Sequence, residues 1–340
     1  MELVSIFMSS GFRAWLDFKR LLGLDLDYLS TLTEIEAIIV NEAPLRVGSG
    51  RGEGLGEIDA PVVRGRDGLP FIPGSSLKGV FRSWLESIYS PEDMCRAGES
   101  SHECCSLKTE LLYKFVKGIE KRFYKGFELE ARELQQLISR EIDFDGIAKR
   151  YNECESSREI VEKFKGVVQS IVEGVTVLEL LTLVDKLRSA LFKERLTPCV
   201  ICRAFGNKAL ASHVSISDAK PVDGEVRTLT RTRIAIDRFT KTALPKVLFD
   251  YEYIPEGYRW RFRIISWNID VRDLNHAASA KLRLLLNSLA SIGLFIGGMK
   301  SVGYGLVKLV VEESKAKICS VEGDTIKCEV KPLSELLTQR

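Results

Sequence analysis

Cysteine and histidine residues gather at two places in this 340-residue chain, with spacings that suit a zinc ion. Cys199 and Cys202 form a CxxC pair, and a second cluster begins at Cys95. Zinc prefers four soft ligands in a tetrahedron, and a CxxC turn supplies two thiolates at the correct separation. We predict a structural zinc site with ligands drawn from both clusters: Cys95, His102, Cys104, Cys199 and Cys202.

The members of the second cluster that complete this site stay open. His102 and Cys104 can both reach by spacing, and Cys105 is then expected to point away because its neighbour ligates. The zinc would tie together the two ends of residues 106–198. Ordinary buried cysteines are the alternative. A catalytic deaminase-type zinc is disfavoured, because His102 is followed at once by Glu103 and the HxE pattern is incomplete.

The composition indicates the compartment in which we expect this protein. Eight cysteines are too sparse and too clustered for a disulfide scaffold, which favours metal binding or free thiols in a reducing compartment. No run of about 18 uncharged apolar residues is present, and the first 20 residues carry Glu2, Arg13 and Asp17. We therefore expect a cytoplasmic protein with no membrane partner.

Two glycine-bearing segments combine exposed backbone with cations. In FIPGSSLKGVFRSWLE, residues 71–86, a Pro-Gly turn precedes a helix capped by Ser75 or Ser76. Such a helix start offers backbone N–H groups, hydroxyls and Lys78 to an anion. The second segment, IGGMKSVGYGLVKL at 296–309, places four glycines around a lysine, a serine and a tyrosine. Both segments are candidates for binding phosphates.

The overall charge of +2 does not by itself indicate a nucleic-acid partner, because phosphate binding depends on local clustering. Residues 225–263 hold nine Arg or Lys against five Asp or Glu. A solvated hairpin face is the ordinary interpretation of such a run. A phosphate-binding surface is the other.

Hydrophobic periodicity separates helices from strands along the chain. Amphipathic spacing predicts helices in residues 5–30, 75–89 and 276–292, and helical spacing dominates 90–198. Short strand-like runs predict strands at 33–41 and 305–311 and in four stretches between 213 and 269. The pattern predicts an α+β protein, and its order is compatible with a βαββαβ ferredoxin-like core that carries insertions.

The glycine-bearing segments, the strand and loop at 35–61, CVICRAFG at 199–206 and RTRIAIDRFTKTALPK at 231–246 occur in an order that resembles the RAMP (repeat-associated mysterious protein) superfamily. These are RNA-binding subunits of CRISPR interference complexes, and the likeness is closest to type III backbone subunits. The resemblance covers 34–89 and 199–311. It implies a ferredoxin-like (RNA-recognition-like) core in 31–89 and 199–312, with a thumb hairpin at about 226–257. An N-terminal helical extension (1–30), a mainly helical insertion (90–198) and a C-terminal segment (313–340) surround it.

The resemblance implies a role in antiviral defence, as a backbone subunit that binds a guide CRISPR RNA through its phosphates. The thumb would kink the guide, with Phe239 and Leu244 either wedged between bases or packed within the hairpin. The implied RNA-binding residues are Arg46, Ser75, Ser76, Lys78, Arg82, Arg231, Arg233, Arg238, Lys241, Lys300, Ser301 and Tyr304.

Asp59, in GEIDAPV, resembles the family motif G-x-hydrophobic-Asp-x-Pro, whose aspartate cleaves target RNA with Mg²⁺ or another divalent cation. A carboxylate can position a hydrated Mg²⁺ near a scissile phosphate and the 2′-hydroxyl. Arg46 stands where many relatives show a histidine, which leaves the role of that position open. A non-catalytic scaffold that binds the guide is the alternative.

The implied partners are the guide and target RNAs, other RAMP subunits, small subunits, the large polymerase-like subunit and further copies of this chain. Two other functions are disfavoured. A P-loop enzyme requires GK[ST], whereas Lys78 precedes Gly79. A guide-processing nuclease would use a histidine as acid or base, and no histidine lies on a matched motif.

Overall fold

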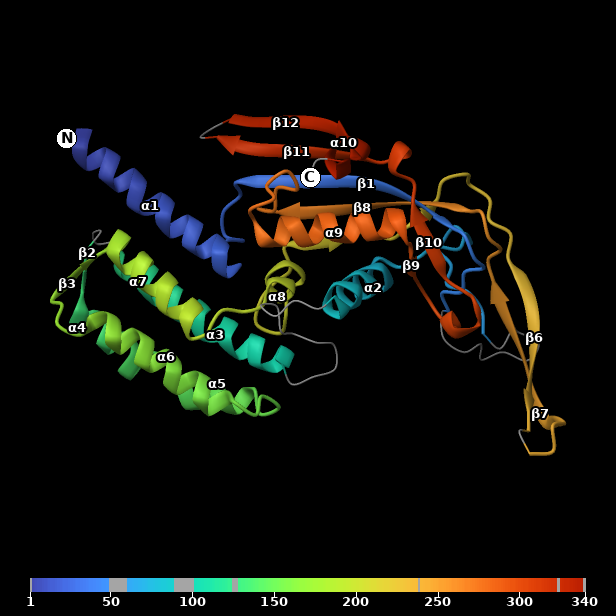
Figure 1. Ribbon diagram of the computed structural model, residues 1–340, viewed down its shortest axis with the longest axis horizontal. Coiled ribbons are helices and arrows are strands. Elements are labelled where there is room, and N and C mark those ends of the chain that lie inside the picture. Colours follow the sequence, from blue (N-terminus) through green and yellow to red (C-terminus); the bar gives the residue numbers. More distant parts are fainter. Residues whose placement is uncertain are drawn as a thin grey trace. The chain divides into compact units, whose positions relative to one another are not determined.

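The computed structural model describes residues 2–48, 60–88, 101–123, 128–237, 239–322 and 325–338 (Figure 1). The chain forms two compact units, and each is interleaved in sequence. One unit joins Met1–Ser30 to Glu86–His213, and the other joins Thr31–Leu85 to Val214–Arg340. The predicted extension and insertion therefore belong to the same unit. Residues 199–213, which we assigned to the core, also belong to that unit.

An antiparallel sheet is the centre of the second unit. Strand β1 (Thr31–Asn41) pairs along its length with β8 (Arg259–Trp267). On its other side it pairs first with β11 (Lys315–Glu322) and then with β10 (Leu306–Leu309). The remaining strands extend the sheet at its edges: β4 (Val214–Ile216) and β5 (Lys220–Pro221) on β8, β9 (Leu294–Phe295) on β10, and β12 (Thr325–Pro332) on β11.

Side-chain alternation gives the sheet one apolar face and one charged face. Trp260, Phe262 and Ile264 of β8 are fully buried, as the period of two residues along a strand requires. Helix α2 (Gly74–Ser87) packs on this face, where the rings of Phe81 and Phe262 lie 6.0 Å apart. Helix α9 (Ala277–Ser291) packs against β10, and the short helix α10 (Leu333–Thr338) follows β12.

The opposite face of β8 carries arginines that are paired with carboxylates. Arg259 binds Asp223 and Glu313, and two further pairs join Arg261 to Glu36 and Arg263 to Glu34. For this part of the basic run, the ordinary interpretation of a solvated charged face is correct.

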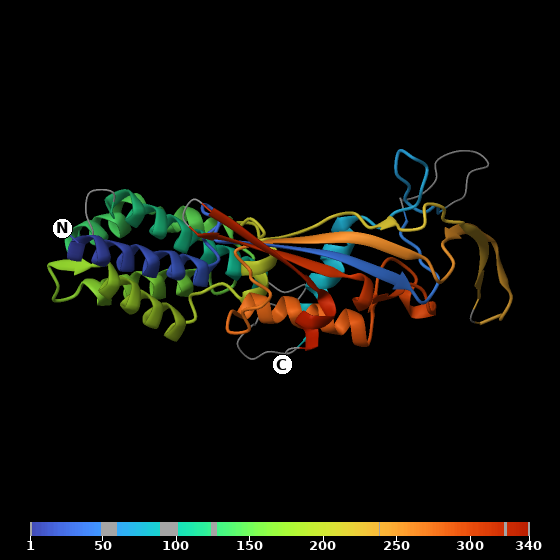
Figure 2. The ribbon, with the colours of Figure 1, turned by 90° about the horizontal axis from the view of Figure 1, so that it is seen from above.

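A separate hairpin of β6 (Leu229–Ile236) and β7 (Ala243–Tyr253) extends away from the sheet, as Figures 1 and 2 show. Its residues fall within the range of about 226–257 that we predicted as the thumb hairpin. At its tip the Asp237 carboxylate accepts hydrogen bonds from the backbone N–H groups of Phe239 and Thr240, at 2.7 and 2.9 Å. This side-chain turn leaves Phe239 96% exposed.

The first unit is helical and has a core of its own. The long helices are α1 (Glu2–Leu22), α3 (Ser101–Phe123), α6 (Ser157–Val172) and α7 (Leu180–Lys193). Shorter elements connect or follow them: β2 (Glu128–Glu130), α4 (Ala131–Gln136), the π-helix η1 (Leu137–Glu141), α5 (Phe144–Arg150), β3 (Val177–Glu179) and α8 (Val200–Phe205). Trp15 and Phe18 of α1 join Phe115, Phe164 and Leu187 in one buried cluster.

An ionic network attaches α1 to α3 in this unit. The Lys19 side chain is 3% exposed, and its ammonium group lies 2.6 Å from the Asp27 carboxylate and 2.8 Å from that of Glu120. Helix α1 ends earlier than predicted, because Gly23 adopts a left-handed φ of +72°. The other predicted helices and strands named above agree with the structure to within a few residues at their ends.

Two disulfides contradict the expectation that all the cysteines are free or bind metal. Cys104 is bonded to Cys154 in the helical unit, and Cys319 of β11 is bonded to Cys328 of β12. Their Cα atoms lie 5.0 and 4.0 Å apart. Both partners of each pair are brought together by local packing that the spacing of cysteines does not reveal. Across the described segments, no helix combines the length and the apolar character needed to cross a membrane.

Replacing Lys19 by Ala is predicted to destabilise the helical unit by about 2 kcal/mol, because it removes the buried member of the two lysines, Lys19 and Lys117, that both carboxylates share. Burial alone would raise the pKa values of Asp27 and Glu120, but bonds to Lys19 and Lys117 hold both below their ordinary values. This contribution is therefore present at neutral pH and is lost as acidification protonates the two groups. Thermal unfolding at several pH values measures it.

The matched control is Lys163→Ala, which removes an exposed pair with Glu159 that spans one helical turn. Its expected cost is much smaller than that of Lys19→Ala, because solvent screens an exposed pair. Equal costs for the two variants at neutral pH would contradict a structural role for the buried network.

Candidate nucleic-acid interface and metal centre

Three arginines lie over tyrosine rings at the base of the hairpin. The guanidinium carbon of Arg231 is 5.5 Å from the centroid of the Tyr253 ring. That of Arg233 is 5.5 Å from the Tyr251 ring, and Arg46 lies 6.0 Å from the same ring. These distances are in the range of cation–π attraction.

The register of the hairpin produces this arrangement. Arg231 is paired across the strands with Tyr251, and Arg233 with Phe249. Because alternate residues of a strand share a face, both arginines lie on the same side as the aromatic residues of β7. We call this group of side chains the arginine–tyrosine platform: Arg46, Arg231, Arg233, Phe249, Tyr251, Tyr253 and Tyr304.

Tyr304 is a buried member of the platform that contacts both Arg231 and Tyr251. Its side chain is only 4% exposed, its hydroxyl accepts a hydrogen bond from Arg231 at 3.2 Å, and it lies 3.1 Å from the Tyr251 hydroxyl. Burial, with the Tyr251 hydroxyl as the next cause, raises the pKa of Tyr304 to about 12. Tyr304 was predicted to bind RNA, and the structure places it as an orienting partner of Arg231.

The C-terminal glycine loop packs against the segment that carries Arg46. Gly298 donates its N–H to the Arg46 carbonyl at 2.9 Å, and Gly305 donates to the Pro44 carbonyl at 2.8 Å. Gly297 has a φ of +79°, and a Cβ there would lie 2.2 Å from the Arg46 oxygen. These glycines permit close backbone packing, whereas we expected them to expose backbone to an anion. Lys300 and Ser301 of this loop are exposed.

The arginines of the platform differ from those of the sheet in whether a carboxylate lies beside them. Within the described residues, Arg46, Arg231 and Arg233 have no carboxylate within 4.0 Å, whereas each arginine of β8 named above has one. Cations without a local counter-ion attract phosphates most strongly. Aromatic rings beside them can stack with bases. The platform thus combines both means of holding a single strand without reading its sequence.

The start of α2 differs from the prediction. The helix begins at Gly74, so neither Ser75 nor Ser76 is the residue that precedes it. The Gly74 N–H donates to the Asp218 carboxylate at 2.8 Å, which already places an acid at this terminus. Gly74 is required because a Cβ would lie 2.3 Å from the Ile216 carbonyl oxygen.

Lys78 and Arg82 lie one turn apart on α2 and remain candidates for contact with phosphates. Burial, and then the nearby charge of Arg82, lower the pKa of Lys78. Ser75 beside them is exposed and Ser76 is half-buried.

Several predicted residues lie outside the described part of the chain. These are Asp59, Cys95 and Arg238, together with the side chain of Leu244 in β7. Ala60, which follows Asp59 in the sequence, is buried against Tyr251 and Tyr304 of the platform. The tip residues Phe239 and Lys241 are exposed, and Lys241 adopts a φ of +57°.

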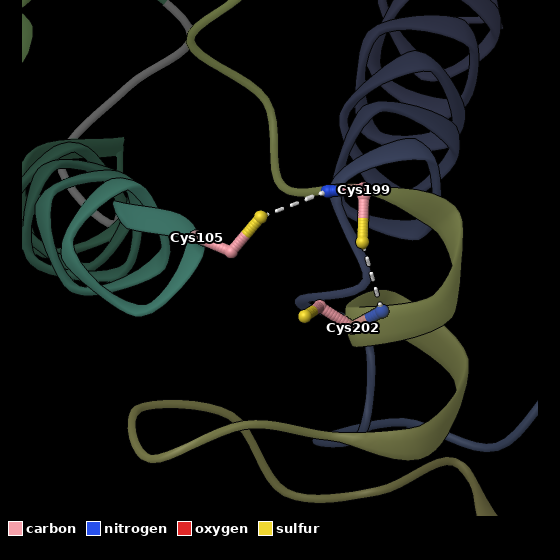
Figure 3. A group of neighbouring side chains, drawn as sticks. All are labelled: Cys105, Cys199 and Cys202. Atoms are coloured by element: carbon pink, nitrogen blue, oxygen red, sulfur yellow. Dashed lines mark hydrogen bonds between the residues drawn. The ribbon is translucent and has the colours of Figure 1, made fainter. Parts of the chain in front are cut away.

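Three buried thiols form the metal-ligating cluster, which Figure 3 shows. The sulfur atoms of Cys105, Cys199 and Cys202 lie within 4.8 Å of one another. Cys199 precedes α8, and its sulfur accepts the Cys202 N–H at 3.3 Å. The Cys199 N–H in turn donates to the sulfur of Cys105 at 3.5 Å.

His102 lies beside this cluster and belongs to the same unit. Its Nδ1 is 3.5 Å from the Cys202 sulfur, and its Nε2 is 3.2 Å from the buried Glu86 carboxylate. A proton on Nε2, shared with Glu86, gives Nδ1 the lone pair that a zinc ligand needs. Three thiolates and this nitrogen match the donor set of a structural zinc ion.

The structure corrects the choice between neighbouring cysteines. Cys105 faces the CxxC pair, and Cys104, which we had named as a ligand, is bonded to Cys154. The physical reason is helical spacing, since His102 and Cys105 are three residues apart in α3 and therefore share a face. The sequence held this signal, because the i, i+3 relation is visible in HECC.

The sequence reasoning also missed the aromatic residues of β7, although FDYEY at 249–253 shows alternate aromatics.

A family model described as the RAMP superfamily matches residues 42–308. The chain belongs to the RAMP superfamily. The match includes every residue of the platform, the first glycine-bearing segment and all but the last residue of the second.

This RAMP chain is similar to two known proteins. It is 25% identical over 311 residues to the CRISPR system Cmr endoribonuclease Cmr4 of Pyrococcus furiosus, with 78% of this chain and 91% of that protein covered. It also resembles a chain in the cryo-EM structure of the Type III-B Cmr-beta bound to cognate target RNA. That likeness has a TM-score of 0.35 and 16% identity, and covers 81% of this chain and 96% of the other.

Purified protein is predicted to contain about one zinc ion per chain, measured by elemental analysis. Cys105→Ala and the double variant Cys199→Ala with Cys202→Ala should lose the metal and unfold at a lower temperature. Cys104→Ser should keep it. Retention of zinc in Cys105→Ala, or loss in Cys104→Ser alone, would contradict the ligand set of His102, Cys105, Cys199 and Cys202.

Proposed function

We propose that this RAMP protein is a guide CRISPR RNA-binding backbone subunit of a type III ribonucleoprotein interference complex, and that it cleaves bound target RNA through Asp59 with a divalent metal. The arginine–tyrosine platform is the observation that carries the RNA-binding part. The similarity to a Cmr endoribonuclease supports the choice of complex and of reaction.

The fold supports this proposal. We infer a ferredoxin-like core from two observations. The central strands lie side by side in the order β10, β1, β8 and β4, and all neighbours are antiparallel. Along the chain, α2 lies between β1 and β4, and α9 lies between β8 and β10. In this interpretation the hairpin of β6 and β7 is the thumb, and its exposed Phe239 is suited to separating adjacent bases. We also propose a cytoplasmic location, and assembly with other RAMP subunits, small subunits, the large subunit and copies of this chain.

The protein's own contribution to binding follows from its charges. Arg46, Arg231 and Arg233 attract the phosphates, and the rings beneath them fix where the guanidinium groups lie. Lys78 and Arg82, with Lys300 and Ser301, extend the set of polar groups available to the backbone of the guide. None of these contacts requires a particular base, which suits a guide of variable sequence.

In the described residues, the one group of three or more side chains suited to binding metal is the cysteine cluster. A cleavage metal would bind Asp59 together with oxygens of the RNA and water, which fits the preference of Mg²⁺ for few carboxylates and substrate phosphates. Such a cation supplies charge neutralisation at the scissile phosphate. The protein would hold the carboxylate in place and keep the RNA backbone beside it.

Replacing Arg231 and Arg233 together by Gln should weaken guide RNA binding roughly tenfold or more, because glutamine can neither neutralise a phosphate nor stack as a guanidinium does. The slope of log affinity against log salt should fall by about 0.7 for each phosphate that is no longer neutralised. Filter binding at several salt concentrations measures both quantities.

The control for this variant is Arg261→Gln with Arg263→Gln, which removes the same charge from the paired face of β8. Its affinity should remain close to that of the wild type. If both double variants weaken binding equally, net charge and not the platform determines RNA binding.

Asp59→Ala is predicted to abolish target cleavage while leaving RNA binding intact, with a loss of rate of at least about a hundredfold. The assay is cleavage of a guide-complementary RNA by the reconstituted complex in Mg²⁺. Wild-type protein should cut at regular intervals. If wild type and variant both bind and neither cuts, the chain is a non-catalytic scaffold that binds the guide.

A further inference from the structure

Glu252 of β7 is a buried acid on a hairpin that otherwise carries many exposed side chains. It is 5% exposed, whereas Ile234 and Phe249 of the same hairpin are 56% and 40% exposed. Burying a carboxylate is costly unless it is paired and hydrogen-bonded. A carboxylate retained at such a position therefore points to a specific set of partners.

The partners of Glu252 come from two other segments of the same unit. Its Oε2 accepts the N–H of Val62 at 3.0 Å, and its Oε1 accepts a hydrogen bond from the Arg64 guanidinium. Thr228, which directly precedes β6, also bonds to Glu252 and accepts from Arg64 at 2.9 Å. One carboxylate thus joins β7, the residue before β6 and the segment 60–64.

Backbone hydrogen bonds hold the same segment. The Ala60 N–H donates to the Asp250 carbonyl at 3.2 Å, and the Glu252 N–H donates to the Ala60 carbonyl at 3.1 Å. On the other side, the Val63 N–H donates to the Val47 carbonyl at 2.9 Å. Residues 60–63 are therefore fixed between the platform strand β7 and the segment that carries Arg46.

Burial alone would raise the pKa of Glu252, but hydrogen bonds from Thr228, the Val62 backbone and Arg64 hold it below the ordinary value of 4.5. The group is consequently a carboxylate at neutral pH. It provides a charge-assisted bond to Arg64, which is stronger than the bond that a neutral side chain would make.

We propose that Glu252 is a positioning residue for target cleavage, because it fixes segment 60–64, which directly follows Asp59 in the sequence, to the base of the hairpin. This inference rests on the proposed function of Asp59. Glu252 itself has no role in contacting RNA or metal. A displacement of about 1 Å at a reacting group is enough to cost a hundredfold in rate, so loss of the lock should affect cleavage before binding.

The test uses the reconstituted complex with Glu252→Gln and Glu252→Ala. Gln keeps an acceptor for Val62 but lacks the charge opposite Arg64, and its single-turnover cleavage rate should fall about tenfold. Ala can make none of these side-chain hydrogen bonds, and its rate should fall about a hundredfold. The dissociation constant for target RNA should change less than about threefold in both. Arg64→Gln should not add to the defect of Glu252→Gln, because the two act as one unit.

The control is Glu256→Gln, which removes an exposed carboxylate just beyond β7. It should cleave at the wild-type rate. Thermal unfolding of each variant shows whether it is folded, and Glu252→Gln decides the result if Glu252→Ala does not fold.

Asp59→Ala is measured in parallel to separate the two proposals. If Asp59→Ala cleaves like the wild type, the proposed catalytic function is wrong. If Asp59→Ala is inactive while both folded Glu252 variants cleave normally, the positioning inference is wrong. The inference is also overturned if the Glu252 variants lose binding and cleavage by the same factor, since the residue would then serve only to hold the hairpin in place.

Discussion

The anchoring of Tyr251 at the base of the hairpin is the interaction on which the arginine–tyrosine platform depends. A two-stranded hairpin is only marginally stable alone in water. Tyr251 is 1% exposed, packs against Ala60 and Tyr304, and carries Arg46 and Arg233 over its ring. This ring is therefore both the apolar anchor of the hairpin and the support for two of its cations. An arginine on an unanchored ribbon would lose more side-chain entropy on binding RNA, because nothing would hold it beforehand.

Local compensation of charge explains how a nearly neutral protein can still carry a basic surface in one place. The basic residues between 225 and 263 fall into two classes once the strands form. Those of β8 face Glu34, Glu36 and other acids across the sheet, so their fields largely cancel. Those of β6 face rings, which attract them without neutralising them. The overall charge of +2 conceals this difference.

The sequence predicted the order of elements well because hydrophobic periodicity and glycine motifs are local signals. It predicted the arginines of the platform, but not Tyr251, because its burial depends on Ala60 and Tyr304, which are far apart in sequence. The same limit applies to Glu252, whose partners come from residues 62–64 and 228. The glycines at 297 and 305 were recognised as special. Their role in packing against residues 44–46 was not, since a motif cannot show which backbone approaches it.

The cysteines show how a rotation of one residue changes the chemistry of a side chain. Successive residues of a helix point about 100° apart. Cys104 and Cys105 of α3 therefore face different neighbours: one meets Cys154, and the other meets the CxxC pair with His102 on its own face. Because the two groups use separate sulfurs, the disulfide does not compete with a metal for ligands. Glu86 adds a constraint of its own. A carboxylate beside Nε2 favours the tautomer with the proton on Nε2, so that Nδ1, which faces Cys202, carries no proton. The three thiols thus have an oriented histidine nitrogen beside them, which is the arrangement that the predicted zinc site requires.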